Sequence, residues 1–176
     1  LPLGTVAPTF ELIDTVSDTM LSLEELKSDK ATVIMFICNH CPYVIHVNEG
    51  LVALANDYIP KGVSFIAIST NDAEEYHVDS PENMKAHAAD EGYPFPYLYD
   101  KSQAVARAYD AACTPDFYIF DGGMKLAYRG RLDDSRPNSG IPVTGKDMRA
   151  ALDDIIAHQI ISTDQVPSMG CNIKWK

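Results

Sequence analysis

The stretch Val33-Ile-Met-Phe-Ile-Cys38-Asn39-His40-Cys41-Pro42-Tyr43 joins an apolar run to two cysteines and a proline. Its β-branched and aromatic residues predict a buried strand over about residues 31–38. Pro42 suits the first turn of a helix, where its missing N–H leaves no hydrogen bond unmade. Cys41 therefore falls at a helix N-terminus, where backbone N–H groups stabilise a thiolate. We interpret the stretch as a redox site.

Composition limits the classes of protein that this chain can represent. Its 176 residues predict a single domain, 1–176, that ends in a polar tail over 162–176. The net charge of −11 disfavours binding to nucleic acid or to an anionic membrane surface. No apolar run approaches the roughly 20 residues that span a bilayer. Residues 1–5 do not resemble a signal peptide, and we expect a cytoplasmic location.

The segments on either side of the cysteines predict alternating strands and helices. Residues 10–12 and 20–22 favour a hairpin, and Ser22 and Glu25 have the spacing of a helix capping box. Apolar residues recur at helical spacing after Pro42, and residues 63–69 read as a second buried strand. The order strand, helix, strand predicts a parallel crossover.

The second half of the chain continues this alternation. Residues 70–80 are polar and acidic and predict a surface loop. We expect helices over 81–91, 101–109 and about 144–159, and a hairpin over 116–128. The fold class is therefore α/β, a mixed central sheet with helices on both faces.

A Cys-x-x-Cys motif has three interpretations. It indicates redox exchange, a metal site, or two small buried apolar residues. Its position between a strand and a helix favours redox exchange, which needs no organic cofactor and no metal. Zinc requires four ligands, and no second Cys-x-x-Cys is present. A metal-binding or metallochaperone module using Cys38, Cys41 and Cys113 is the non-enzyme alternative, with Cys171 as a further ligand.

Four segments together resemble a known family. They are Cys38-Asn-His-Cys-Pro-Tyr-Val44, Ala112-Cys-Thr-Pro-Asp-Phe117, Tyr128-Arg-Gly-Arg-Leu-Asp-Asp-Ser-Arg-Pro137 and Gly170-Cys-Asn-Ile-Lys-Trp175. The chain resembles the peroxiredoxin-like redoxins, in the alkyl hydroperoxide reductase and thiol-specific antioxidant group of the thioredoxin superfamily. The resemblance implies a thioredoxin-like fold with an N-terminal β-hairpin extension. It also implies that Thr114-Pro115 is the cis-proline turn facing the cysteines.

The register of the two cysteines suggests their roles. Cys41 has the location of a thioredoxin nucleophile, whereas Val44, one helical turn later, has no thiol. The partner instead lies upstream at Cys38. If Cys38 were the nucleophile, Pro42 would move beyond the first turn and remove a helical hydrogen bond. We therefore predict a thiol–disulfide oxidoreductase in which Cys41 attacks and Cys38 resolves, through a reversible Cys38–Cys41 disulfide.

A thiol peroxidase is the enzyme alternative. Peroxiredoxins resemble Pro-x-x-x-Thr/Ser-x-x-Cys-Pro, yet Ile34 and Cys38 stand at the proline and hydroxyl positions relative to Cys41. Thr114-Pro115 lies near where the family's arginine is expected, which leaves Arg107, Arg129 and Arg131 as substitutes. Thioredoxin's buried acidic residue also has no counterpart in residues 31–38.

Three further residues have open assignments. His40 either stabilises the Cys41 thiolate as an imidazolium or lies exposed and modulates the reduction potential. Cys113 is a third redox or ligand thiol, or a small buried residue. Cys171 is a further resolver or packs under the tail, and the packing interpretation is favoured. The expected partners are a disulfide-bearing protein or a small thiol or peroxide, with a thioredoxin or a low-molecular-weight thiol as reductant.

Overall fold

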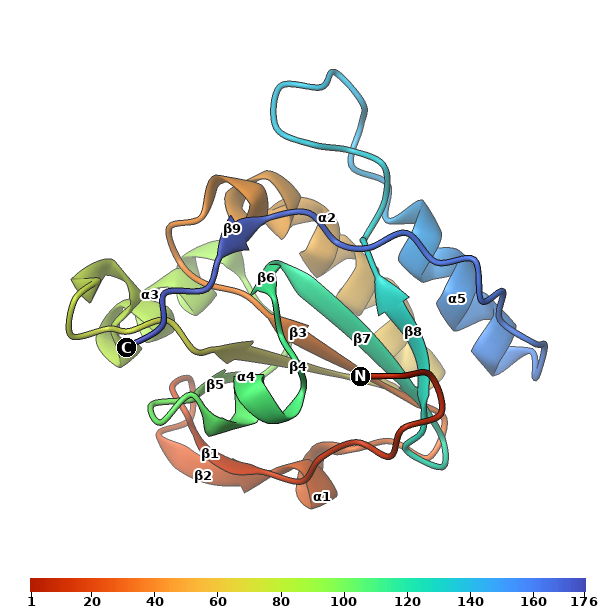
Figure 1. Cartoon of the computed structure of the whole chain (residues 1–176), viewed down its shortest axis with the longest axis horizontal. Coiled ribbons are helices and arrows are strands. Elements are labelled where there is room, and N and C mark those ends of the chain that lie inside the picture. The colour runs from red at the N-terminus through yellow and green to blue at the C-terminus, as the bar shows by residue number, and fades with distance from the viewer.

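The computed structural model describes residues 1–176 and is built on one mixed sheet of seven strands, in the order β2-β1-β5-β4-β3-β7-β8 (Figure 1). These strands are β1 Glu11–Asp14, β2 Thr19–Ser22, β3 Ala31–Phe36, β4 Val63–Ser69, β5 Tyr97–Tyr99, β7 Asp116–Asp121 and β8 Leu126–Gly130. A second sheet pairs β6 Cys113–Thr114 with β9 Cys171–Asn172. The C-terminal tail thus forms part of the folded structure.

Five α-helices and two short 3₁₀ helices connect the strands. They are α1 Leu23–Leu26, α2 Pro42–Tyr58, η1 Ile59–Lys61, η2 His77–Asp79, α3 Pro81–Glu91, α4 Ala104–Ala108 and α5 Lys146–Ile156. None of these helices combines the length and the apolar character that crossing a membrane requires.

The central strand β3 supplies side chains to two apolar cores, one on each face of the sheet. Val33 and Met35 belong to the core that residues of α2, α3 and α5 cover, and every residue of β3 is buried. Ile34 and Phe36 belong to the other core, which residues of α1 and α4 cover. Period-two alternation along the strand therefore places helices on both faces. The predicted α/β fold class is confirmed.

Most predicted elements are present with shifted ends. The Ser22 hydroxyl accepts from the Glu25 N–H at 3.1 Å and Glu25 accepts from the Ser22 N–H, which completes the capping box. β3 and β4 pair in parallel, as the crossover requires. The helix predicted over 101–109 begins only at Ala104, because Gln103 has a left-handed backbone with φ 65°.

The predicted surface loop over 70–80 is confirmed only in part, because residues 74–78 are exposed whereas both ends of the segment hold buried side chains. Asn71 and Asp79 are 2 % and 0 % exposed, and η2 occupies part of the segment. Composition misled the prediction because these polar side chains are buried among hydrogen-bond partners rather than in water. This segment borders the cysteines.

Candidate active site

Cys41 is the residue that starts helix α2, as predicted. It occupies the N-cap position with Pro42 as the first helical residue. Its carbonyl accepts from the N–H groups of Val44 and Ile45 at 3.0 and 2.9 Å. The side chain of Cys41 makes no capping hydrogen bond, and the positive end of the helix dipole favours an anion at this position once the thiol is reduced.

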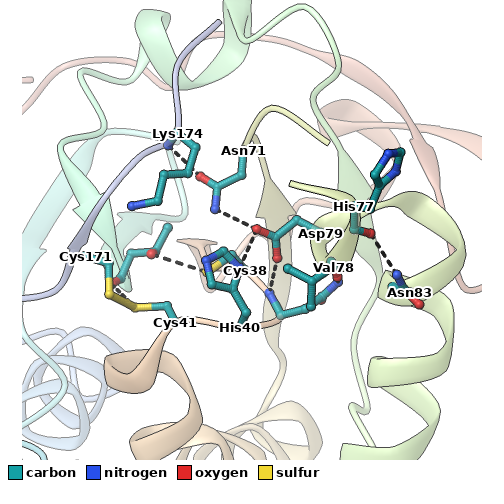
Figure 2. Close-up of polar contacts among 12 residues, drawn as sticks. Cys38, His40, Cys41, Asn71, His77, Val78, Asp79, Asn83, Cys171 and Lys174 are labelled. Atoms are coloured by element: carbon teal, nitrogen blue, oxygen red, sulfur yellow. Dashed lines mark hydrogen bonds and ion pairs between the residues drawn. A yellow bond between two sulfur atoms is a disulfide. The ribbon is translucent and has the colours of Figure 1, made fainter. Parts of the chain in front are cut away.

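A disulfide joins Cys41 to Cys171 in the C-terminal tail, with a Cα–Cα distance of 6.3 Å (Figure 2). The interpretation of Cys171 as a residue that only packs under the tail is therefore wrong. Cys38 and Cys113 are free thiols. A Cys38–Cys41 disulfide is not the pairing in this structure and stays a prediction for another disulfide arrangement of the oxidised protein.

The Thr114–Pro115 peptide bond is cis, which confirms the turn that the family resemblance implied. Thr114 contacts both cysteines of the motif: its carbonyl oxygen lies 3.4 Å from the Cys41 sulfur and its hydroxyl 3.6 Å from the Cys38 sulfur. The turn therefore holds the two sulfurs against one residue. β6, which contains Thr114, also pairs with the tail strand β9.

The Cys38 thiol is buried, with 1 % of its surface exposed. Burial raises its pKa above the ordinary value, and the negative charge of Asp79 raises the pKa further. Hydrogen bonds from the Thr114 hydroxyl and from the backbone N–H groups of Cys41 and His40 lower the pKa, but burial dominates. Cys38 is therefore a protonated thiol near neutral pH.

Asp79 is a buried residue near the cysteine motif that sequence reasoning missed. Its Oδ1 accepts from the Asn39 N–H at 2.8 Å, and its Oδ2 accepts from the Asn71 amide at 3.0 Å. The Nδ1 atom of His40 lies 2.7 Å from Oδ2 (Figure 2). The His40 ring stacks on Tyr76, with ring planes 4° apart. The sequence left two alternatives for His40, a contact with the Cys41 thiolate or an exposed position. In the structure its ring is partly exposed, and its partner is the buried Asp79 carboxylate.

Cys38, His40 and Asp79 form a compact group of acid–base side chains. Their ligand atoms lie within 4.8 Å of one another, and they are the only such group in the structure that is close enough to hold a metal ion. The short His40–Asp79 contact and the two amide donors already occupy the carboxylate. We interpret the arrangement as one in which the carboxylate orients the imidazole near Cys38.

Cys113 lies apart from this group. Its thiol donates to the Pro115 carbonyl at 3.5 Å and to the Ser168 carbonyl at 3.8 Å. Burial and the nearby Asp116 raise its pKa to about 11. With Cys41 engaged in a disulfide, the predicted set Cys38, Cys41 and Cys113 does not form a three-thiolate site in this structure.

A cavity of about 350 Å³ lies beside Pro115, between the start of α2 and the tail. Tyr43, His46 and Met169 line it, together with Arg131. Each arginine considered as a peroxide-binding residue has another partner. Arg131 pairs with Asp147 at 2.6 Å, Arg129 pairs with Asp116 at 3.0 Å, and Arg107 lies 4.5 Å from the centre of the Trp175 ring.

The chain belongs to the AhpC/TSA family, whose model matches residues 3–129. The matched region contains the cysteine motif and the cis-proline turn, and the family is one of thiol-based redox proteins. The predicted family is thereby confirmed. No curated protein sequence matches the chain.

Solved structures support the fold. An uncharacterized conserved protein from Geobacillus kaustophilus is 64 % identical, with a TM-score of 0.98, and the match covers 99 % of this chain and 93 % of that one. A hypothetical protein from Sinorhizobium meliloti is 44 % identical, with a TM-score of 0.97 and coverage of 100 % and 96 %. The thioredoxin domain of a thiol-disulfide oxidoreductase from Bacteroides vulgatus is 19 % identical, with a TM-score of 0.64 and coverage of 86 % and 99 %. The thioredoxin-like fold is thus confirmed.

Proposed function

We propose that this protein is a thiol–disulfide oxidoreductase in which Cys41 is the nucleophile and Cys38 is the resolving thiol. One observation carries the proposal. The Cys41 sulfur is bonded to a cysteine of the half-exposed tail, while the buried Cys38 sulfur lies against the same Thr114. In Figure 2, Cys41 lies between Cys171 and Cys38. Cys41 thus has a disulfide partner toward solvent and a free thiol toward the interior.

The reaction is two successive thiol–disulfide exchanges. The Cys41 thiolate attacks one sulfur of a substrate disulfide, and the other substrate sulfur leaves and takes up a proton. The Cys38 thiolate then attacks the Cys41 sulfur and releases the second substrate thiol. The substrate disulfide is reduced by two electrons, and the Cys38–Cys41 pair is oxidised by two. A thiol reductant reopens that disulfide.

The geometry of thiol–disulfide exchange places the attacking and the leaving sulfur on opposite sides of the Cys41 sulfur. In such a displacement the attacking sulfur, the central sulfur and the leaving sulfur lie nearly in line. A sulfur that occupies the outer side of Cys41, where Cys171 is bonded, must therefore be displaced from the inner side. We assign Cys38 as that thiol, because it is free and buried and contacts Thr114 as the Cys41 sulfur does.

Deprotonation of Cys38 needs a base, because burial raises the pKa of its thiol. A ring nitrogen of His40 lies within 4.8 Å of the Cys38 sulfur, and Asp79 Oδ2 lies 2.7 Å from His40 Nδ1. We assign His40 as the acceptor of the Cys38 proton and Asp79 as the residue that positions His40. The proton returns to a leaving thiolate later in the cycle.

Peroxide reduction is the weaker assignment for this site. The position that carries a hydroxyl in peroxiredoxins is Cys38, and all three candidate arginines have other partners. A peroxide at Cys41 would therefore lack the donors that polarise its O–O bond. Stopped-flow oxidation of the reduced protein by hydrogen peroxide distinguishes the two functions, and fast, saturating oxidation would favour the peroxidase.

Disulfide mapping tests the proposed function. The reduced Cys171→Ser variant is treated with one equivalent of oxidised glutathione, quenched with acid, alkylated and mapped by mass spectrometry. We expect a Cys38–Cys41 disulfide and release of both glutathione molecules. In the Cys38→Ser/Cys171→Ser variant, glutathione should remain attached to Cys41. A glutathione adduct that persists on Cys38 in the Cys41→Ser/Cys171→Ser variant would reverse the assigned order.

A further inference from the structure

The C-terminal tail binds to the active site as an added β-strand. β9 pairs antiparallel with β6, with Cys171 opposite Thr114 and Asn172 opposite Cys113. Figure 1 shows the tail crossing from α5 to lie beside β6 and the start of α2. The strand that precedes the cis-proline therefore has an edge that accepts an extended segment, and the sulfur of that segment reaches Cys41.

Contacts beyond the cysteine hold the tail in register. Ile173, two residues after Cys171, is buried in the second apolar core. Lys174 donates its N–H to Asn71 Oδ1 at 2.9 Å, and its carbonyl accepts from the Asp72 N–H at 2.8 Å. Trp175 lies under the Arg107 guanidinium. The surface around Thr114 thus recognises an extended backbone and one apolar side chain.

The residue before the cysteine must be small. A Cβ atom on Gly170 would overlap the Thr114 carbonyl, which is backbone and cannot move aside without shifting the cis-proline turn. Ser168 Oγ, two residues earlier, donates to the Pro115 carbonyl. The tail therefore contacts both Thr114 and Pro115, and Gly170 permits the close approach of the tail backbone to Thr114.

We propose that the tail occupies the binding site of a polypeptide substrate, so that Cys41–Cys171 is an intramolecular counterpart of the mixed disulfide formed with that substrate. This inference rests on the proposed function and adds the substrate class. The substrate is an extended cysteine-bearing segment with a small residue before the cysteine and an apolar residue two positions after it. Cys38 opens the tail disulfide from the inner side, the tail leaves β6, and the substrate strand takes its place.

The electron balance follows from the same exchanges. When Cys38 attacks the Cys41–Cys171 disulfide, the Cys38–Cys41 bond forms and Cys171 leaves as a thiol. A dithiol reductant then supplies two electrons and two protons to open Cys38–Cys41. Cys41 is afterwards free to attack the substrate disulfide.

Peptide exchange tests the substrate class on the full chain. The protein is the Cys38→Ser/Cys171→Ser variant, in which Cys41 can form a mixed disulfide that nothing resolves. The probe is the peptide Ser-Met-Gly-Cys-Asn-Ile-Lys-Trp-Lys, the sequence of residues 168–176, supplied as its disulfide with glutathione. One control peptide has valine in place of the glycine, and a second has the same composition in permuted order. Adducts on Cys41 are quantified by mass spectrometry over time.

We expect the first peptide to form its Cys41 adduct at least about tenfold faster than either control, as for a modest difference in binding free energy. Adding Gly170→Val to the protein should accelerate its reaction with the first peptide, because the protein's own tail then competes less for β6. Equal rates for the three peptides would overturn the substrate class while leaving the proposed function intact. If oxidised glutathione and all peptides fail to modify Cys41, the proposed function itself fails.

Discussion

Cys41 and Cys38 stand three positions apart and are both buried, but their electrostatic surroundings differ. Cys41 is at the N-terminus of α2, whereas Cys38 lies near the Asp79 carboxylate. In the Cys171→Ser background, we expect iodoacetamide near neutral pH to alkylate Cys41 at least about tenfold faster than Cys38, the ratio that one pKa unit gives. Single Cys38→Ser and Cys41→Ser changes in that background identify the reacting thiol by peptide mapping. Rapid alkylation that persists on Cys38 would contradict this expectation.

A second prediction at the residue scale concerns Asp79→Asn. The charge of Asp79 raises the pKa of Cys38, so removing that charge should lower it. In the Cys41→Ser/Cys171→Ser background, the midpoint of Cys38 alkylation against pH should move down by about half a unit to one unit. Glu74→Gln is the matched control, since Glu74 is an exposed acid of the same segment that does not shift Cys38. An equal shift in both variants would show that Asp79 has no specific effect.

Residue patterns identified some site residues and missed others for physical reasons. Pro42 revealed Cys41 as a helix start because proline has few acceptable positions. Asp79 gave no signal, because a buried acid in a polar segment is indistinguishable in sequence from a solvated one. Cys171 carried a weak signal in Ile173 and Trp175, two apolar residues in an otherwise polar tail.

At the scale of elements, strands and helices with strong periodicity were predicted well, and pairings between distant segments were not. The crossover from β3 through α2 to β4 follows from local order. The β6–β9 pair joins segments of two residues each that lie far apart in the chain. Two-residue strands have no period to detect, and their pairing depends on the disulfide and on anchoring side chains.

The tail should therefore loosen when its disulfide is reduced. We expect hydrogen exchange of residues 166–176 to accelerate on adding dithiothreitol, because β9 is short and keeps only its non-covalent anchors. Exchange in α2 beyond its first turn should stay unchanged and serves as the internal reference. Mass spectrometry of peptic fragments measures both. Unchanged exchange in the tail would mean that Ile173 and the backbone contacts hold it without the disulfide.

At the scale of the whole molecule, buried tyrosines determine the response to alkaline pH. Burial raises the pKa of Tyr97, Tyr109 and Tyr118 above the ordinary value. These groups remain protonated in the folded state while the unfolded chain ionises near pH 10. Because the pKa of each tyrosine is raised in the folded state, its contribution to stability is fully present below the unfolded pKa. That contribution is lost as the pH rises from the unfolded pKa through the folded pKa.

Urea unfolding at several pH values checks this prediction. The free energy of unfolding should be steady up to about pH 8, begin to fall as the thiols of the unfolded chain ionise near pH 8.5, and fall more steeply above about pH 10. Cys38 and Cys113 contribute in the same direction, since their pKa values are also raised. Tyr118→Phe should reduce the slope of the free energy of unfolding against pH by the contribution of one proton. An unchanged slope would exclude Tyr118 from the effect.

The Cys41–Cys171 bond encloses 130 residue steps, almost the whole distance from the motif to the end of the chain. Closing a ring of that size restricts the unfolded chain by about 5 kcal/mol. Thermal unfolding with and without dithiothreitol should therefore show a lower Tm for the reduced protein, and Cys171→Ser should remove the difference.

By thermodynamic reciprocity, the intact fold resists reduction of this bond by the same free energy with which the bond resists unfolding. The protein is consequently most stable when the Cys41–Cys171 disulfide holds the tail against the active site. In the proposed cycle the reduced protein is the less stable form, and attack of the Cys171 thiol on the Cys38–Cys41 disulfide, with Cys38 leaving as a thiol, re-forms the Cys41–Cys171 bond.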